Sequence, residues 1–278
     1  MMITHDLNVC VFPMQITWDD ITANLNTLRN ALKNIHPQTD LVVIPETFST
    51  GFPVGKTKEQ ILMLLGKSPD NADLISEQTA EEIRSLAAQY NLAIAGSMVC
   101  SDNGSLYNRG FIAEPNGDIS YGDKHHLFSM AGEDEIFTAG DKRLTVRYRG
   151  WNISLVICYD LRFPVWCRNV NNDYDLLVIC ANWPEVRISA WNKLLPARAI
   201  ENESYLCACN CSGVDNKEFI YDGGSDIIDY KGNSIAKSFK IDESTTFLYA
   251  TLSRAGLDSF REKFPAWRDN DAFTLLPR

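Results

Sequence analysis

The sequence predicts an α/β fold, a single domain in which helices lie outside a mixed sheet. Short apolar segments typical of strands alternate with segments of helical periodicity, and both halves of the chain show this alternation. No linker or low-complexity segment separates the halves. Because layered α/β domains reach this length, we expect residues 1–278 to form one domain, with the polar and aromatic tail, about 255–278, contributing to a dimer.

The first predicted elements are a strand, a helix and a second strand. Residues 7–12 are rich in strand formers. Residues 21–35 have apolar side chains four and three positions apart, which places these side chains on one face of a helix. Thr17 followed by Asp20 resembles a capping box at the start of this helix. Residues 41–44 are continuously apolar, as in a strand covered on both sides, and Glu46 follows them.

The remaining elements continue the alternation. Residues 83–90 have the apolar spacing of a second helix, and residues 92–95 and 111–114 favour strands. The stretch 204–252 favours strands and turns. Between these regions the sequence predicts strands around Val146 and Ile153, a short helix after Pro164, a strand over 175–180 and a helix through Ala199.

Composition and charge exclude several classes of protein. Hydrophobic residues are 45% and charged residues 22% of the chain, as in ordinary globular proteins. The net charge of −10 would repel phosphate backbones and anionic membranes, so we expect no nucleic-acid or membrane partner. No stretch approaches the ~18 apolar residues of a membrane span, and the first ten residues lack the features of a secretory leader. We therefore expect a cytoplasmic protein whose eight cysteines are free thiols.

Three residues at predicted strand ends are candidates for catalysis. The tetrapeptide Leu-Val-Ile-Cys occurs twice, but only Cys158 is followed by polar residues, at the end of a strand where open α/β sheets bind ligands. Glu46 also closes an apolar strand, and Lys124 follows the predicted strand 119–123. Each residue alone also fits a structural role, as a buried cysteine, a solvated loop acid or an exposed lysine.

Taken together, the residues around these positions resemble a known family. The segments Val-Ile-Pro-Glu46-Thr-Phe, Tyr-Gly-Asp-Lys124-His-His and Val-Ile-Cys158-Tyr-Asp-Leu-Arg-Phe-Pro are similar to the three hallmark blocks of the nitrilase superfamily of carbon-nitrogen hydrolases, and Ala-Asn-Trp183-Pro is similar to a further family segment. The resemblance implies a four-layer α-β-β-α sandwich and a Glu, Lys, Cys triad. A second family glutamate precedes a Gly-Asp turn; Glu133 matches it best, and Glu135 is the competitor.

The residues after the cysteine indicate a branch of this superfamily. True nitrilases typically have Cys-Trp-Glu, whereas Cys-Tyr-Asp-Leu-Arg-Phe resembles the omega-amidase and Nit-type amidase branch. This resemblance implies a homodimeric amidase without metal or cofactor, which hydrolyses the terminal amide of 2-oxoglutaramate or 2-oxosuccinamate. The alternative enzymatic function is hydrolysis of deaminated glutathione or of another small amide. The non-enzymatic alternative is a binding protein that retains the hydrolase fold.

The resemblance also assigns catalytic roles. Cys158 would form a thioester, and Glu46 would act as the base that takes its proton. Lys124 would favour the thiolate and then, with the backbone N–H of Tyr159, stabilise the oxyanion, and Glu133 would orient Lys124 or water.

Other residues near the hallmark blocks are expected to bind substrate. Arg162, at the start of the next predicted helix, would bind a substrate carboxylate or else pair with a structural acid such as Asp160. The remaining substrate-binding candidates are aromatic: Phe52, Phe128 and Trp183.

Two other kinds of site receive less support from the sequence. His125 and His126 suggest a Cys-His hydrolase, but no peptidase block accompanies them, and as neighbours on a strand they would point to opposite faces and not share a metal. Cys207, Cys209 and Cys211 would share one strand face, but they lack the Cys-x-x-Cys spacing of a zinc site and are expected to be packing residues.

Overall fold

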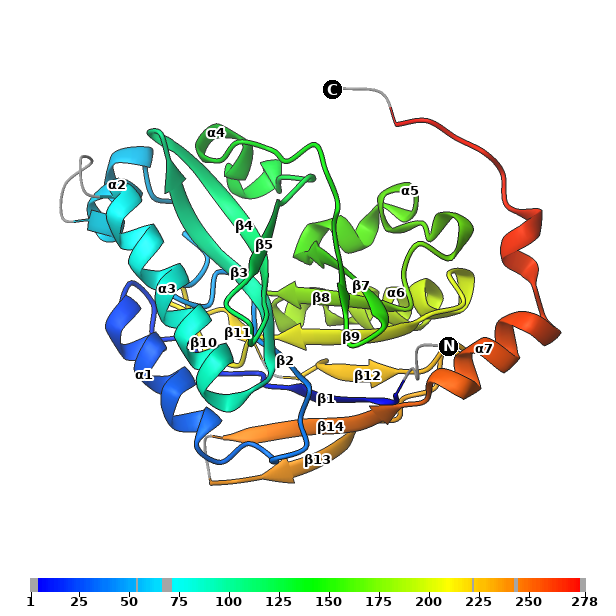
Figure 1. Ribbon diagram of the computed structural model, residues 1–278. Coiled ribbons are helices and arrows are strands. Elements are labelled where there is room, and N and C mark those ends of the chain that lie inside the picture. The colour runs from blue at the N-terminus through cyan, green and yellow to red at the C-terminus, as the bar shows by residue number, and fades with distance from the viewer. Residues whose placement is uncertain (1–4, 54, 67–71, 222, 243–244, 276–278) are drawn as a thin grey trace.

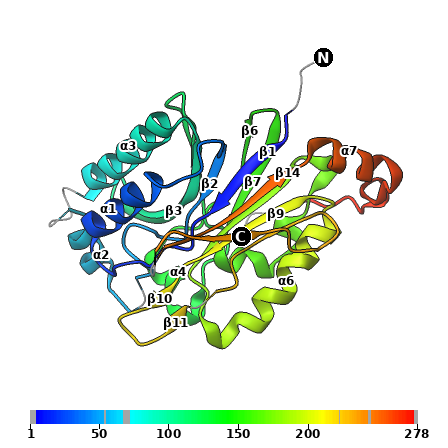
Figure 2. The ribbon, with the colours of Figure 1, turned by 90° about the horizontal axis from the view of Figure 1, so that it is seen from below.

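The chain forms two sheets that face each other, with helices over their outer faces. The computed structural model describes residues 5–53, 55–66, 72–221, 223–242 and 245–275. Figure 2 shows α1 (Ile21–Leu32) and α3 (Ala72–Tyr90) on one side of the sheets and α6 (Ile188–Glu201) on the other. This arrangement confirms the predicted four-layer α/β fold.

The larger sheet has strand order β13-β14-β1-β2-β3-β4-β5. β1, β2 and β3 are parallel, and the other neighbours are antiparallel. Its strands are β1 (Leu7–Val11), β2 (Leu41–Val43), β3 (Ala93–Asp102), β4 (Ser105–Ala113), β5 (Ile119–Asp123), β13 (Lys237–Lys240) and β14 (Thr246–Leu252).

The smaller sheet has order β12-β9-β8-β7-β6, with β7, β8 and β9 parallel (Figure 1). Its strands are β6 (Leu144–Tyr148), β7 (Trp151–Ile157), β8 (Leu176–Ala181), β9 (Tyr205–Asn210) and β12 (Asp226–Ile228), and a separate hairpin pairs β10 (Gly213–Val214) with β11 (Ile220–Tyr221). The other helices are α2 (Lys58–Gly66), α4 (Glu133–Ile136), α5 (Pro164–Cys167) and α7 (Arg254–Lys263), with 3-10 turns at Ser129–Ala131, Cys158–Arg162, Val170–Asn172, Glu185–Arg187 and Ala266–Asp269.

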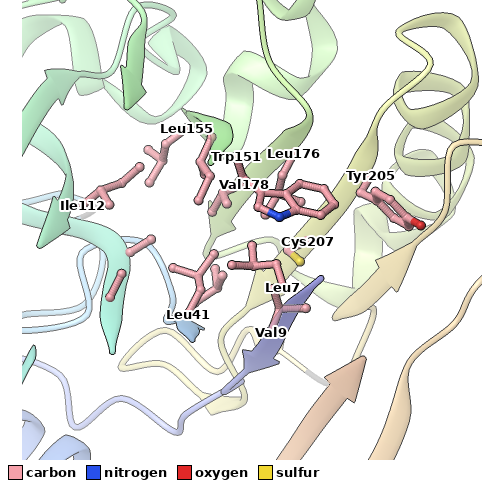
Figure 3. Close-up of a cluster of buried hydrophobic side chains, with 14 of the residues drawn as sticks. Leu7, Val9, Leu41, Ile112, Trp151, Leu155, Leu176, Val178, Tyr205 and Cys207 are labelled. Carbon is pink, nitrogen blue, oxygen red and sulfur yellow. The ribbon is translucent and has the colours of Figure 1, made fainter. Parts of the chain in front are cut away.

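Strand alternation divides the apolar side chains into an inner core and two outer cores. Figure 3 shows the inner core, where residues such as Leu41 and Val9 of one sheet face Val178 and Cys207 of the other. Val42, between the inward-facing neighbours of β2, instead packs in the outer core beneath α1 and α3. A third core lies between the smaller sheet and α6.

The parallel strands bring the candidate residues to one edge of the sandwich. Glu46 follows β2 and Cys158 follows β7, each beyond the carboxyl end of its strand. β5 is antiparallel to β4, which is antiparallel to β3, so β5 runs in the same direction as β3 and delivers Lys124 to the same edge. This is the edge at which open α/β sheets bind ligands.

Two local predictions are wrong. The helix α1 begins at Ile21, so its N-cap is Asp20, whose carboxylate accepts the N–H of Ala23, and Thr17 lies outside the helix. The three neighbouring cysteines do not share one face either. Cys207 and Cys209 point into the inner core, whereas Cys211 lies beyond the end of β9 and packs in the outer core under α1.

The chain after α7 leaves the sandwich in an extended path with a 3-10 turn, drawn in red in Figure 1. Residues 276–278 of the predicted dimer-forming tail lie outside the described residues. Among the described helices, none is both long enough and apolar enough to cross a lipid bilayer.

Candidate active site

A cavity of about 230 Å³ lies at the carboxyl edge of the strands. Glu46, Lys124 and Cys158 all line it, although they come from three separate parts of the chain. The structure therefore brings the predicted triad together. The other lining residues are mainly aromatic and cationic: Phe52, Phe128, Met130, Ala131, Tyr159, Arg162, Asn182, Trp183, Pro184, Arg187, Asp215, Lys217, Phe219 and Tyr221.

The ammonium of Lys124 lies between two carboxylates. Its Nζ is 2.8 Å from Oε1 of Glu46 and 2.9 Å from both carboxylate oxygens of Glu133. Each of the three residues is 1% exposed. Charges buried to this degree are stable only when paired and hydrogen-bonded, so the three groups depend on one another.

Burial and pairing act in opposite directions on these groups. Burial alone would lower the pKa of Lys124, but Glu133 and Glu46 outweigh it and hold that pKa well above its ordinary value, so the ammonium stays charged. Burial, together with repulsion from Glu46, raises the pKa of Glu133 against the attraction of Lys124. With both carboxylates ionised, the cluster carries one net negative charge.

Cys158 is the first residue beyond β7 and adopts a strained backbone conformation. Its φ is +45°, a left-handed value that typically costs a non-glycine residue about 1–3 kcal/mol and is common at functional sites. The second copy of Leu-Val-Ile-Cys lies differently. Cys180 pairs with Ile157 inside the sheet and points into the inner core, whereas Cys158 is partly exposed.

The thiol of Cys158 is neutral at rest. Burial, reinforced by the carboxylate of Glu46, raises its pKa well above the ordinary value, and the opposing effect of Lys124 is smaller. Lys124 does favour the thiolate, as expected, but burial of the thiol and the charge of Glu46 outweigh its effect on the pKa. Attack by the sulfur therefore requires a base that removes its proton, and Glu46 is the carboxylate whose charge and hydrogen bond act on it.

The structure separates the two candidate second glutamates. Glu133 is the first residue of α4, and its Oε2 also accepts the backbone N–H of Phe128 at 2.6 Å. Glu135 is exposed on the same short helix. Only Glu133 is in contact with Lys124, which supports its assignment over Glu135.

Two asparagines of the site were missed in the sequence. Asn108, fully buried on β4, donates from Nδ2 to Glu46 Oε1 at 2.8 Å and to Glu133 Oε1 at 3.2 Å. Asn182, just beyond β8, donates its backbone N–H to Glu46 Oε2 at 2.8 Å and its side-chain amide to the Glu46 carbonyl at 3.0 Å. The usable signals were the strand-end position of Asn182 and the position of Asn108 on the buried face of its strand, in phase with Leu106.

The predicted substrate-binding aromatic residues line the cavity. Phe52 lies 5.4 Å from Lys124 Nζ, measured to its ring centroid, and Phe128 packs against the ring of Tyr159. Tyr159 is the second residue of a 3-10 turn, where a backbone N–H has no partner within the turn. Tyr159 also lines the cavity, next to Cys158.

Arg162 also lines the cavity, but the prediction that it begins a helix is wrong. It ends the 3-10 turn Cys158–Arg162 and does not begin a helix, since α5 starts at Pro164. Its guanidinium lies 4.8 Å from the ring of Trp183, and within the described ranges no acidic side chain forms an ion pair with it. Asp160, the alternative partner, is engaged elsewhere.

Asp160 instead joins the cysteine turn to the histidines. Its Oδ1 accepts the backbone N–H of His126 and lies 2.8 Å from the ring Nδ1, while Oδ2 accepts the N–H of Ile157. His126 stacks on Phe163, and neither histidine lines the cavity.

The histidines also correct a prediction. They lie beyond β5, so strand alternation does not apply, and their rings are only 4.6 Å apart instead of on opposite faces. In the part of the chain that the structure describes, no group of three or more His, Cys, Asp or Glu residues could hold a metal ion.

The exposure of the cysteines predicts selective chemistry. Seven of the eight are buried, and Cys158 alone is partly exposed. Iodoacetamide should therefore modify Cys158 first in the folded protein, at a rate that rises with pH because the raised pKa keeps the thiol protonated. Peptide mass spectrometry identifies the modified residue, and Cys158→Ser is the control. Faster labelling of any other cysteine would contradict this description of the site.

Comparison with known proteins agrees with this geometry. The chain matches the carbon-nitrogen hydrolase family over residues 8–262. Omega-amidase YafV of Escherichia coli strain K12 is 39% identical, over 97% of this chain and 98% of the relative, and a 2-oxoglutaramate amidase of Bacillus subtilis strain 168 is 31% identical, over 80% and 82%. The crystal structure of XC1258 from Xanthomonas campestris, a CN-hydrolase superfamily protein, matches with a TM-score of 0.87 at 36% identity, covering 98% of this chain and 99% of that one. As its three sequence blocks predicted, this chain belongs to the carbon-nitrogen hydrolases of the nitrilase superfamily.

Proposed function

We propose that this protein is an omega-amidase, which hydrolyses the terminal amide of a small 2-oxo acid such as 2-oxoglutaramate to the acid and ammonia. The observation that carries the proposal is the convergence of a thiol, a carboxylate and an ammonium on one small cavity. The substrate class is supported by relatives of similar length named omega-amidase and 2-oxoglutaramate amidase. No cofactor takes part in the proposed reaction.

Acylation would begin with attack of the Cys158 sulfur on the amide carbonyl carbon. The thiol proton passes to Glu46, and the carbonyl oxygen becomes an oxyanion between the Lys124 ammonium and the Tyr159 N–H. The C–N bond then breaks as Glu46 returns the proton to the nitrogen, so ammonia leaves and a thioester remains. Glu133 keeps Lys124 charged and in place throughout.

Deacylation uses the same groups to hydrolyse the thioester. Glu46 takes a proton from water, and the resulting hydroxide attacks the thioester carbonyl carbon. The C–S bond breaks, the acid is released and the thiol recovers its proton from Glu46. Such general acid–base assistance typically contributes about 10² to 10⁴ in rate.

Ammonia release from a panel of amides tests the function. We expect the highest kcat/KM for 2-oxoglutaramate or 2-oxosuccinamate, and a loss of at least about 10³-fold in Cys158→Ser. Cys100→Ser, on β3 away from the cavity, is the matched control and should retain activity. A higher kcat/KM for deaminated glutathione would favour that substrate instead, and no turnover of any amide would favour a binding role.

Arg162 is proposed to bind the carboxylate of the substrate. It lines the cavity, it is half-buried and its planar guanidinium is held against Trp183. A guanidinium can bind a carboxylate through two parallel hydrogen bonds, which the ammonium of lysine cannot reproduce.

The substitution Arg162→Lys separates this role from a structural one. The KM for 2-oxoglutaramate should rise by about 10-fold or more, since hydrogen bonds to a charged group are lost. The KM for an uncharged amide such as butyramide should change little. Equal effects on the charged and uncharged substrates would contradict carboxylate binding.

We also propose that the protein is a homodimer in which the C-terminal tail contacts the partner. Phe264 is 60% exposed, and Phe273 and Leu275 are exposed beyond it on the extended segment. Light scattering of the full chain should give twice the monomer mass, and truncation after Lys263 should lower it. A monomeric full-length chain would contradict the proposal.

A cytoplasmic location is proposed because all eight cysteines are free, which fits a reducing compartment. Cell fractionation that recovers the protein mainly outside the cytoplasm would contradict this location.

A further inference from the structure

We propose that Asn108 is a positioning residue that occupies one oxygen of the Glu46 carboxylate, so that only the other oxygen, Oε2, exchanges a proton with Cys158. The inference rests on the proposed function, because it concerns the base of that reaction. It assigns a role to a residue outside the three hallmark blocks.

Oε1 of Glu46 accepts hydrogen bonds from two donors. Lys124 Nζ and Asn108 Nδ2 each lie 2.8 Å from this oxygen. A carboxylate oxygen offers about two lone-pair positions. Both positions of Oε1 are therefore occupied, and a proton cannot be added there without displacing a donor.

Oε2 of Glu46 has room for a proton. Among the described residues, one hydrogen bond to this oxygen is found, from the backbone N–H of Asn182 at 2.8 Å. One lone pair of Oε2 therefore stays available, on the carboxylate that interacts with the Cys158 thiol. The backbone donor also fixes the direction of that lone pair, because Asn182 holds the Glu46 carbonyl as well.

Glu133 differs from Glu46 in this respect. Its Oε1 accepts from Lys124 and Asn108, and its Oε2 accepts the Phe128 N–H and lies 2.9 Å from Lys124 Nζ. All of its lone pairs face donors. The two glutamates are therefore not equivalent: Glu46 can carry the reaction's proton, and Glu133 serves as a fixed negative charge.

The orientation of the Asn108 amide is fixed by a second chain of hydrogen bonds. Its Oδ1 accepts the hydroxyl of Ser97 at 2.9 Å, and Ser97 Oγ in turn accepts the N–H of Thr47 at 2.9 Å. A flipped amide would place its oxygen against both carboxylates. The backbone carbonyl of Asn108 also accepts the backbone N–H of Lys124. Asn108 therefore contacts the main chain of Lys124 as well as the two carboxylates that bind its ammonium.

Removal of the Asn108 amide should change the pH dependence of activity. Titratable side chains from five parts of the chain interact electrostatically with Glu46, and among them the hydrogen bond donated by Asn108 favours the ionised carboxylate. Protonated Glu46 cannot act as a base, so the acid limb of the pH profile should move to higher pH. The interacting groups are Lys124 after β5, Glu133 of α4, Cys158 after β7, Cys180 of β8 and Cys211 after β9.

The uncharged, nearly isosteric substitution Asn108→Leu tests the proposal, because it removes the donating amide and adds no carboxylate beside Glu46 and Glu133. The pH profiles of kcat/KM and of Cys158 alkylation by iodoacetamide should both move up by about one to two pH units. The maximal kcat should fall on the order of 10²-fold, with a smaller change in KM. The control is Ile112→Val, on the same strand but in the inner core, which should leave both acid limbs in place.

The alkylation profile separates this inference from the proposed function. An unshifted limb in folded Asn108→Leu overturns the role of Asn108, whether or not the protein is an amidase. A shifted alkylation limb without ammonia release from any amide supports the positioning role and contradicts the function. If Asn108→Leu does not fold, Ser97→Ala provides the test: a smaller shift in the same direction supports the proposal, and no shift overturns it.

Discussion

The site depends on one ammonium held between two buried carboxylates. Lys124 follows β5, Glu46 follows β2 and Glu133 begins α4, and none of the three charges could be buried alone without a penalty of several kcal/mol. Removing one partner of such a cluster typically costs about 3–5 kcal/mol. The three charges therefore link distant segments of the chain at the cavity that Cys158 also lines.

The sandwich explains how these segments meet. Two sheets pack through an inner apolar core, and parallel strands of both sheets end at one edge. Polar groups at this edge, such as Asn182 beyond β8, can face one cavity while the strands behind them stay apolar. The strained backbone at Cys158 is tolerated because β7 is fixed on both sides by β6 and β8.

The sequence predicted the fold class and the main site residues because both depend on local patterns. Apolar periodicity indicated the strands, and the change to polar residues after them pointed to Glu46 and Cys158. The family resemblance was confirmed, whereas the catalytic roles stay predictions. Glu133 and Glu135 could not be separated by sequence, since only the turn of α4 decides which of them reaches Lys124.

What the sequence could not predict depends on long-range contacts. Asn108 meets Glu46 only through the pairing of β2, β3 and β4, and nothing local distinguishes it from a structural asparagine. The setting of Arg162 was wrong because a 3-10 turn precedes the helix that Pro164 begins. Lys124 lowers the pKa of the Cys158 thiol, as expected, but the sequence could not show that burial and Glu46 raise it more.

The central claim is that sulfur, carboxylate and ammonium act on one carbonyl group. A crystal structure of Cys158→Ala with 2-oxoglutaramate bound tests it most directly. The amide carbon should lie above the vacated sulfur position, with the amide oxygen hydrogen-bonded to Lys124 Nζ and the Tyr159 N–H and the amide nitrogen on the side of Glu46. An amide bound in the cavity with its carbonyl oxygen directed away from Lys124 would contradict the account.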